Sequence, residues 1–154
     1  MPSHREERLL PYTPQQLYDL VLDVERYPEF LPWCLAARIN RHEPQAVVAD
    51  LVIGFKMVRE RFTSRVAYDP ERLTVETRNV QGPFRHLRSL WHFKPHDEGC
   101  LVDFSLEFEF RSRVLQRLIQ ALFEEAVRRM VAAFEARAKA LYGARGEESI
   151  DLRC

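Results

Sequence analysis

The sequence has no excess charge of either sign, and this absence limits the partners that the protein is expected to have. Lys and Arg together number 23, Asp and Glu number 23, and the formal net charge of the 154 residues is zero. Proteins that coat nucleic acid need a basic surplus to displace the counterions of the phosphate groups. Binding to DNA is therefore not expected, and binding to RNA would need a local basic patch.

Long apolar runs and paired cysteines are missing as well. No apolar stretch approaches the roughly 20 residues that span a bilayer, and the charged first eight residues contain no apolar leader segment. The three cysteines, Cys34, Cys100 and Cys154, form no CxxC pair and do not predict a disulfide framework. We expect a cytoplasmic protein with inert thiols, folded as one domain over residues 1–143 and followed by a polar, disordered tail over 144–154.

Patterns that support catalysis or metal binding are sparse. The five histidines show no metal-ligand spacing, and neither Cys34 nor Cys100 has a histidine at a recognisable spacing. Glu107 and Glu109 flank an inward Phe108 and are expected to face water, so they do not predict an acid–base pair. No helix start follows Gly82, which therefore indicates a turn and not a phosphate loop. We expect no metal, no cofactor and no enzymatic activity.

Hydrophobic periodicity predicts an α+β domain. Pro14 to about Glu25 has helical spacing, and Thr13 is a suitable N-cap. From about Leu35 to Phe110 the period is two, which predicts about six antiparallel strands with one apolar and one charged face. Helical period returns from Ser112 to Gly143, which predicts a helix about 45 Å long. Its apolar stripe needs a partner, so we expect a curved antiparallel sheet wrapped around this C-terminal helix.

The inward positions of the predicted sheet mix aromatic rings with small hydroxyl side chains. The inward hydroxyls are Ser64, Thr77 and Ser89, and they lie among aromatic residues of the strands and the last helix. A mainly apolar cavity with a few polar groups is the usual form of a small-molecule site. The alternative is a filled core in which these hydroxyls bond to neighbouring backbone. Periodicity identifies faces and does not distinguish these two interpretations.

Three separated motifs follow one another along this chain. They are Tyr27–Cys34, then Gly54–Lys56 with Glu60–Val66, and then Gly82–Arg85 with Leu87 and Trp91–Phe93. In this order they resemble the coenzyme Q-binding START-domain family of the polyketide cyclase and lipid-transfer superfamily, over about residues 3 to 142. The chain departs from that family at Arg88-Ser89-Leu90, where a glycine is expected before the Trp91 strand continues.

The resemblance implies a helix-grip fold that binds ubiquinone or a related isoprenoid lipid, supports respiration and performs no catalysis. It implies peripheral contact with the inner face of the membrane, where the ligand is collected, and Phe30 and Trp33 would form an apolar lip for this purpose. Alternatively, these two side chains only fasten their loop to the sheet. The residues expected to bind the ligand are Phe30, Trp33, Phe55, Phe62, Ser64, Thr77, Arg85, Leu87, Trp91, Phe104, Phe108, Leu122 and Met130.

Two other functions compete with lipid binding. Bacterial members of the same family include ribosome-association toxins, so the second hypothesis is a ribosome-binding regulator that interferes with subunit association. It would use a stripe of arginines on the outer face of the predicted sheet. Asp69 and Glu76 lie between these arginines in the sequence, which favours cross-strand ion pairs instead. The third hypothesis is a cyclase-like enzyme for aromatic polyketides, which the lack of an inward acid or base disfavours. The stripe consists of Arg59, Arg61, Arg65, Arg72 and Arg78.

Overall fold

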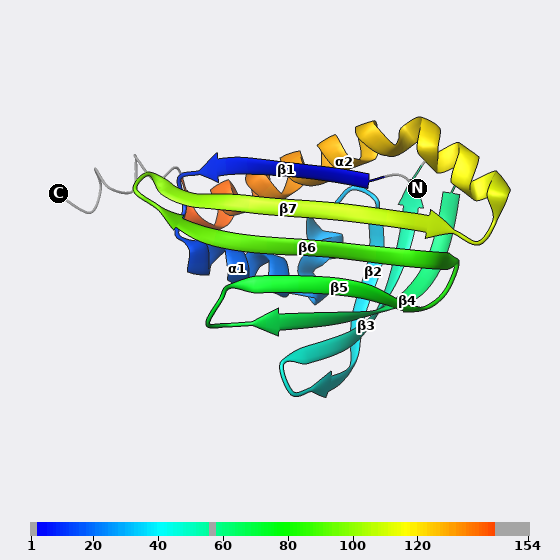
Figure 1. The fold of residues 1–154 in the computed structure, drawn as a ribbon, viewed down its shortest axis with the longest axis horizontal. Helices are drawn as coiled ribbons and strands as arrows, with labels where there is room; N and C mark the ends of the chain where they lie inside the picture. Colours follow the sequence, from blue (N-terminus) through cyan, green and yellow to red (C-terminus); the bar gives the residue numbers. More distant parts are fainter. Residues whose placement is uncertain (1–2, 56–57, 144–154) are drawn as a thin grey trace.

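A single antiparallel sheet of seven strands forms the body of the molecule, with the strand order β1-β7-β6-β5-β4-β3-β2 (Figure 1). The computed structural model describes residues 3–55 and 58–143, so the tail predicted for 144–154 lies outside the described residues. The strands are β1 (Ser3–Leu10), β2 (Cys34–Glu43), β3 (Ala46–Phe55), β4 (Val58–Asp69), β5 (Thr74–Gln81), β6 (Phe84–His96) and β7 (Gly99–Phe110).

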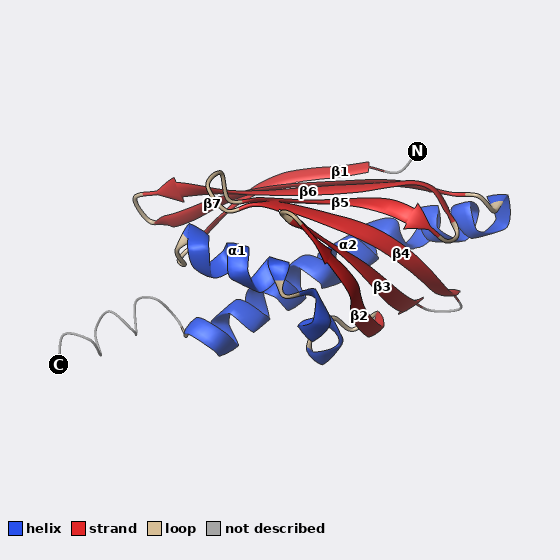
Figure 2. Cartoon of the chain, turned by 90° about the horizontal axis from the view of Figure 1, so that it is seen from below, coloured by secondary structure: helices blue, strands red, loops and turns tan. Residues whose placement is uncertain are grey.

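The sheet curves over two helices, α1 (Pro14–Leu22) and α2 (Arg113–Tyr142) (Figure 2). This arrangement is the helix-grip fold that was predicted. In addition to the strands predicted between Leu35 and Phe110, the whole segment Ser3–Leu10 forms a strand that pairs antiparallel with β7. Its sequence is mostly polar and shows only a short apolar end, so hydrophobic alternation did not mark its full length.

The first helix begins as predicted and ends earlier. Thr13 caps it, since its hydroxyl accepts a hydrogen bond from the backbone N–H of Gln16 at 3.1 Å while the Gln16 side chain accepts one from the Thr13 N–H. At Asp23 the backbone leaves helical geometry, and a 3₁₀ helix, η1 (Val24–Glu29), follows. The expected end at Glu25 is therefore wrong. The loop from η1 leads into β2 at Cys34 and brings Trp33 under the sheet.

The last helix has the predicted bounds, but its two halves pack differently. Ser112 caps its start by accepting a hydrogen bond from the Leu115 N–H, and Gly143 ends it with a φ of 72°. All of its buried residues (Val127, Met130, Phe134 and Ala138) lie from its midpoint onward. Its first turns begin beyond the strand ends in Figure 1. None of the helices in the described part of the chain is long and apolar enough to cross a membrane.

Candidate ligand-binding cavity

A cavity of about 220 Å³ lies between the inner face of the sheet and α2. Side chains of β3 to β7, the end of α1, the Tyr27–Trp33 loop and α2 line it. Most of these side chains are apolar, and the aromatic rings of Phe62, Phe84, Phe108 and Phe110 form a connected cluster in the wall. The centroid of Phe84 is 5.0 Å from that of Phe62 and 4.7 Å from that of Phe110. The sheet and helix therefore leave space that their side chains do not fill.

Most of the residues expected to bind a ligand meet around this cavity. They come from five strands or loops and from α2, and alternation along each strand directs them inward. Whether they bind a ligand stays a prediction. The members of the predicted set that line the cavity are Trp33, Phe62, Ser64, Thr77, Leu87, Trp91, Phe104, Phe108 and Met130.

Four members of the predicted set lie elsewhere or are not described. Phe30 packs on Phe134, with ring centroids 5.2 Å apart, and the Arg137 guanidinium lies over its ring at 5.2 Å, so it fastens its loop to α2. Arg85 is exposed, pairs with Glu109 at 3.3 Å and is not part of the lining, which corrects the expectation that it binds the ligand. Leu122 is half-buried on α2 and is not part of the lining. The side chain of Phe55 lies outside the described residues.

Sequence alternation missed Phe84 for an identifiable reason. Leu87, Ser89 and Trp91 on β6 face inward at odd positions, whereas Phe84 faces inward at an even one. A register shift between Phe84 and His86 against β7 inserts one residue and changes the phase of the alternation. A pattern read with strict period two places Phe84 on the wrong face. Past the bulge the strand runs unbroken through Arg88-Ser89-Leu90, the segment that departs from the family pattern.

Three hydroxyl side chains form a polar band across three neighbouring strands. Thr77 on β5 lies opposite Val66 on β4 and opposite Ser89 on β6, while Ser64 on β4 lies opposite Asn79, two residues from Thr77. Ser64 is fully buried, and its Oγ has no hydrogen-bond partner among the described residues. The filled-core interpretation, in which this hydroxyl bonds to neighbouring backbone, therefore does not hold for Ser64.

A second buried donor without a partner belongs to the loop before β2. The indole Nε1 of Trp33 is buried and has no hydrogen-bond partner in the described part of the chain, and its side chain lines the cavity. Leaving a buried donor or acceptor unsatisfied costs about 1–3 kcal/mol. Tyr27, which also lines the cavity, differs because its hydroxyl donates to the Val21 carbonyl oxygen. Ser64 and Trp33 are thus two lining residues whose buried polar atoms have no hydrogen-bond partner among the described residues.

The cavity lining offers no ionisable group suited to acid–base or nucleophilic chemistry. Among the described residues, no carboxylate, imidazole, thiol, amine or guanidinium lines it. The Tyr27 phenol does, but its burial raises its pKa well above the ordinary value. The buried thiols of Cys34 and Cys100 are outside the lining, and burial raises the pKa of each to about 11, so both are protonated at neutral pH. The arrangement is suited to holding an apolar molecule with a hydrogen-bonding end.

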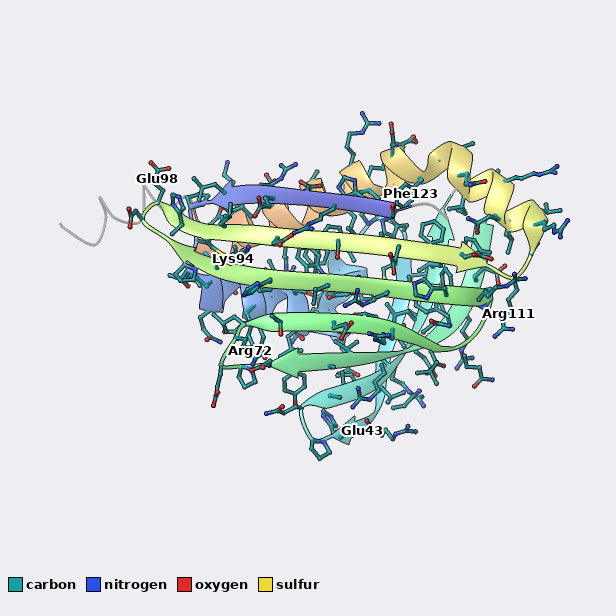
Figure 3. All side chains as sticks on the ribbon, viewed as in Figure 1. Glu43, Arg72, Lys94, Glu98, Arg111 and Phe123 are labelled. Carbon is teal, nitrogen blue, oxygen red and sulfur yellow. The ribbon has the colours of Figure 1, made fainter. Side chains whose placement is uncertain are left out.

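The outer face of the sheet is charged, and most of its arginines are paired with acids. Arg61 lies 3.3 Å from Asp50, Arg65 lies 2.9 Å from Glu43, and Glu76 accepts from both Arg78 and Arg88. Arg72, a member of the predicted stripe, belongs to the β4–β5 turn and not to a strand, as Figure 3 shows. It lies 3.8 Å from Asp69. Ion pairs with acids therefore neutralise much of the predicted stripe.

Comparison with known proteins places the chain among lipid-transport and cyclase folds. Residues 10–135 match the family model described as polyketide cyclase / dehydrase and lipid transport. The chain is 42% identical over 142 residues to the ribosome association toxin RatA of Rickettsia prowazekii, covering 90% of this chain and 97% of that one.

A second relative carries a different name. The chain is 33% identical over 145 residues to the mitochondrial coenzyme Q-binding protein COQ10 homolog B of Xenopus laevis, covering 92% of this chain and 59% of the relative. The solution structure of an 18 kDa Caulobacter crescentus protein matches with a TM-score of 0.76 and 37% identity, covering 94% of this chain and all of that one. The shared architecture extends across nearly the whole described chain.

Proposed function

The chain belongs to the polyketide cyclase / dehydrase and lipid transport family, and from this premise we propose that it binds ubiquinone or a related isoprenoid lipid without catalysing a reaction. In this proposal the apolar walls hold the ring and the first part of the tail. The polar band and Trp33 hold the oxygen-bearing head. The bound lipid would then support respiratory electron transport.

The unpartnered hydroxyl of Ser64 is the observation that carries this proposal. A buried donor in an apolar cavity loses free energy unless a guest supplies an acceptor. A quinone carbonyl oxygen is such an acceptor, and the rest of the molecule is apolar. Trp33 supplies a second donor with the same need. A purely hydrocarbon ligand would leave both donors unsatisfied.

The absence of catalysis is supported by the chemistry of the lining. A cyclase needs groups that move protons at the reacting carbons, and the polar groups of the described lining are hydroxyls, one bonded phenol and two indoles. The name of the Xenopus relative, a coenzyme Q-binding protein, agrees with a binding role. Because such a lipid resides in a bilayer, we propose a cytoplasmic protein that contacts the inner face of the membrane when it collects the ligand.

The two tryptophans of the chain allow a direct test, because both Trp33 and Trp91 line the cavity. A quinone seated there should quench most of the intrinsic fluorescence in a saturable way. The probe is ubiquinone with a single isoprene unit, and free N-acetyltryptophanamide measures collisional quenching. An isoprenoid alcohol of equal length, which lacks the quinone carbonyls, should compete weakly. Quenching that is linear and equal to that of the free amide would contradict the proposal.

Ribosome binding is the second candidate, and the name of the Rickettsia relative favours it. The outer face would supply the contact, although most of its described arginines already pair with acids. The test is co-sedimentation with ribosomal subunits over a range of salt, in which several phosphate contacts would give a steep loss of binding. Arg61→Glu should weaken this co-sedimentation and leave quinone quenching unchanged. If the protein does not co-sediment with ribosomal subunits even at low salt, ribosome binding is refuted.

A further inference from the structure

A second, smaller cavity of about 40 Å³ adjoins the first. The two cavities share four lining residues, namely Val21, Trp91, Phe104 and Phe134. Three of these are aromatic: the Trp91 centroid is 4.3 Å from that of Phe104 and 5.1 Å from that of Phe134. We call Trp91, Phe104 and Phe134 the aromatic partition, since their rings separate the two spaces.

The far side of the small cavity reaches the protein surface between β1 and α2. Its lining there includes Glu6 and Arg8 of β1 and Glu135 of α2. Arg8 pairs with Glu135 and also with Glu6 at 3.1 Å. The Arg8 side chain is 45% exposed, so this ion pair is in contact with solvent. The small cavity therefore leads from the aromatic partition to a solvated ion pair that connects an edge strand to a helix.

The larger cavity is too small for a whole polyprenyl lipid. At about 220 Å³ it falls below the roughly 300–1,000 Å³ of typical small-molecule sites. It has room for a quinone head and the start of a tail, so a longer tail has to leave it. The aromatic partition holds its position by ring contacts, and ring rotation there breaks no hydrogen bond that the structure shows. The small cavity continues the same apolar space in the direction of the surface.

We propose that the small cavity is the subsite for the ligand tail. The isoprenoid chain would pass the aromatic partition, fill the space beside Val131, and leave the protein between β1 and α2 where Arg8 pairs with Glu135. This inference rests on the proposed lipid binding and adds the path and the length preference. An apolar tail of about ten carbons then gains burial that a five-carbon tail does not reach.

The test compares two quinones on three proteins. The ligands are ubiquinone with one isoprene unit and its analogue with a decyl tail. Val131→Phe narrows the small cavity, whereas Ala132→Phe places the same ring on the exposed face of α2 as a matched control. We expect the wild type and Ala132→Phe to prefer the decyl analogue by about tenfold or more. Val131→Phe should lose this preference and keep its affinity for the short quinone.

Two outcomes separate the failure of the tail subsite from the failure of lipid binding. If the short quinone binds but Val131→Phe retains the preference for the decyl tail, the tail leaves elsewhere and this inference is overturned. If neither quinone binds the wild type, the proposed lipid binding is refuted, and the tail subsite with it.

A second measurement needs no variant, in case Val131→Phe does not fold. A quinone with a photoreactive diazirine at the tail end should label peptides from β1 and from α2 around Val131 and Glu135. Labelling confined to the loop at residues 27–33 would overturn the inference.

Discussion

The two faces of the sheet differ in whether their polar groups have hydrogen-bond partners within the protein. On the outer face, Glu76 accepts from Arg88 at 2.6 Å and Asp50 accepts from Thr63 at 2.5 Å, so these half-buried carboxylates have protein partners. On the inner face, the fully buried Ser64 hydroxyl has no partner among the described residues. The outer-face carboxylates thus find partners within the chain, whereas Ser64 and Trp33 on the inner side have hydrogen-bonding capacity that no described residue uses.

The largest effect is expected where the inner face is most tightly packed. The Phe134 ring contacts Tyr27, Phe30 and Trp91 at centroid distances of 5.1 to 5.5 Å. Phe134→Ala removes these contacts and joins the two cavities, which should lower the free energy of unfolding by about 3–5 kcal/mol. Denaturant titration of the ligand-free protein measures it. A loss below about 1 kcal/mol would show that α2 does not pack on the sheet in this way.

Blocking the cavity should abolish binding with less damage to the fold. Ala126 lines the cavity from α2 and is only half-buried, so Ala126→Trp places a large ring in the open space. We expect quinone affinity to fall by more than tenfold, about 1.4 kcal/mol. Ala132→Trp, on the exposed face of the same helix, should bind like the wild type. Isothermal titration calorimetry compares them, and equal affinity in all three proteins would move the ligand out of this cavity.

Ser64→Ala should act in opposite directions on stability and on binding. Without ligand, removal of an unpartnered buried hydroxyl should leave the free energy of unfolding unchanged or raise it by up to about 1 kcal/mol. With ligand, the loss of one hydrogen bond should weaken quinone binding about five- to tenfold. Ser105→Ala, on the outer face of β7, is the matched control for both measurements. A variant that loses stability and keeps its affinity would refute the role given to Ser64.

The smallest effect belongs to the outer ion pairs and depends on pH. Burial tends to raise the pKa of Glu76, but the hydrogen bond from Arg88 and the charge of Arg78 outweigh it and hold the pKa below its ordinary value. A carboxyl with a lowered pKa stabilises the fold above its ordinary pKa and loses this contribution as the pH falls through the lowered pKa. Glu76→Gln should therefore flatten the decline in stability between about pH 5 and 3, by at most about 1 kcal/mol.

Unfolding curves at several pH values measure this effect. The quinone affinity of Glu76→Gln should equal that of the wild type, because Glu76 is on the outer face. An acid decline equal to that of the wild type would show that the Glu76 ion pairs contribute nothing.

The sequence was sufficient to predict the fold and the faces of most strands, because alternation and helical spacing carry that information directly. Val75 and Thr77 against Glu76 on β5 are an example, and α2 has its predicted ends. The pattern failed where the phase changes: the bulge before His86 turned Phe84 inward and left Arg85 outside. It also failed for β1, whose polar sequence pairs by backbone along its full length.

The properties that make the cavity a candidate site are three-dimensional and have no sequence period. The missing partner of Ser64 depends on which atoms β3 and β5 bring near it, and the orientation of the Trp33 indole depends on how η1 enters β2. Phe30 belongs to the same motif as Trp33 and yet packs on α2, because Phe134 and Arg137 lie beneath it. The cavity volume follows from sheet curvature, which residue patterns do not specify.

Mass spectrometry of the bound lipid tests the central claim most directly. The protein is purified from cells with respiratory membranes, extracted with organic solvent, and its extract is compared with that of Ala126→Trp. The account predicts quinone in near-equimolar amount in the wild type and little in the variant. A wild-type extract without quinone, still empty after incubation with quinone-loaded vesicles, would contradict the account.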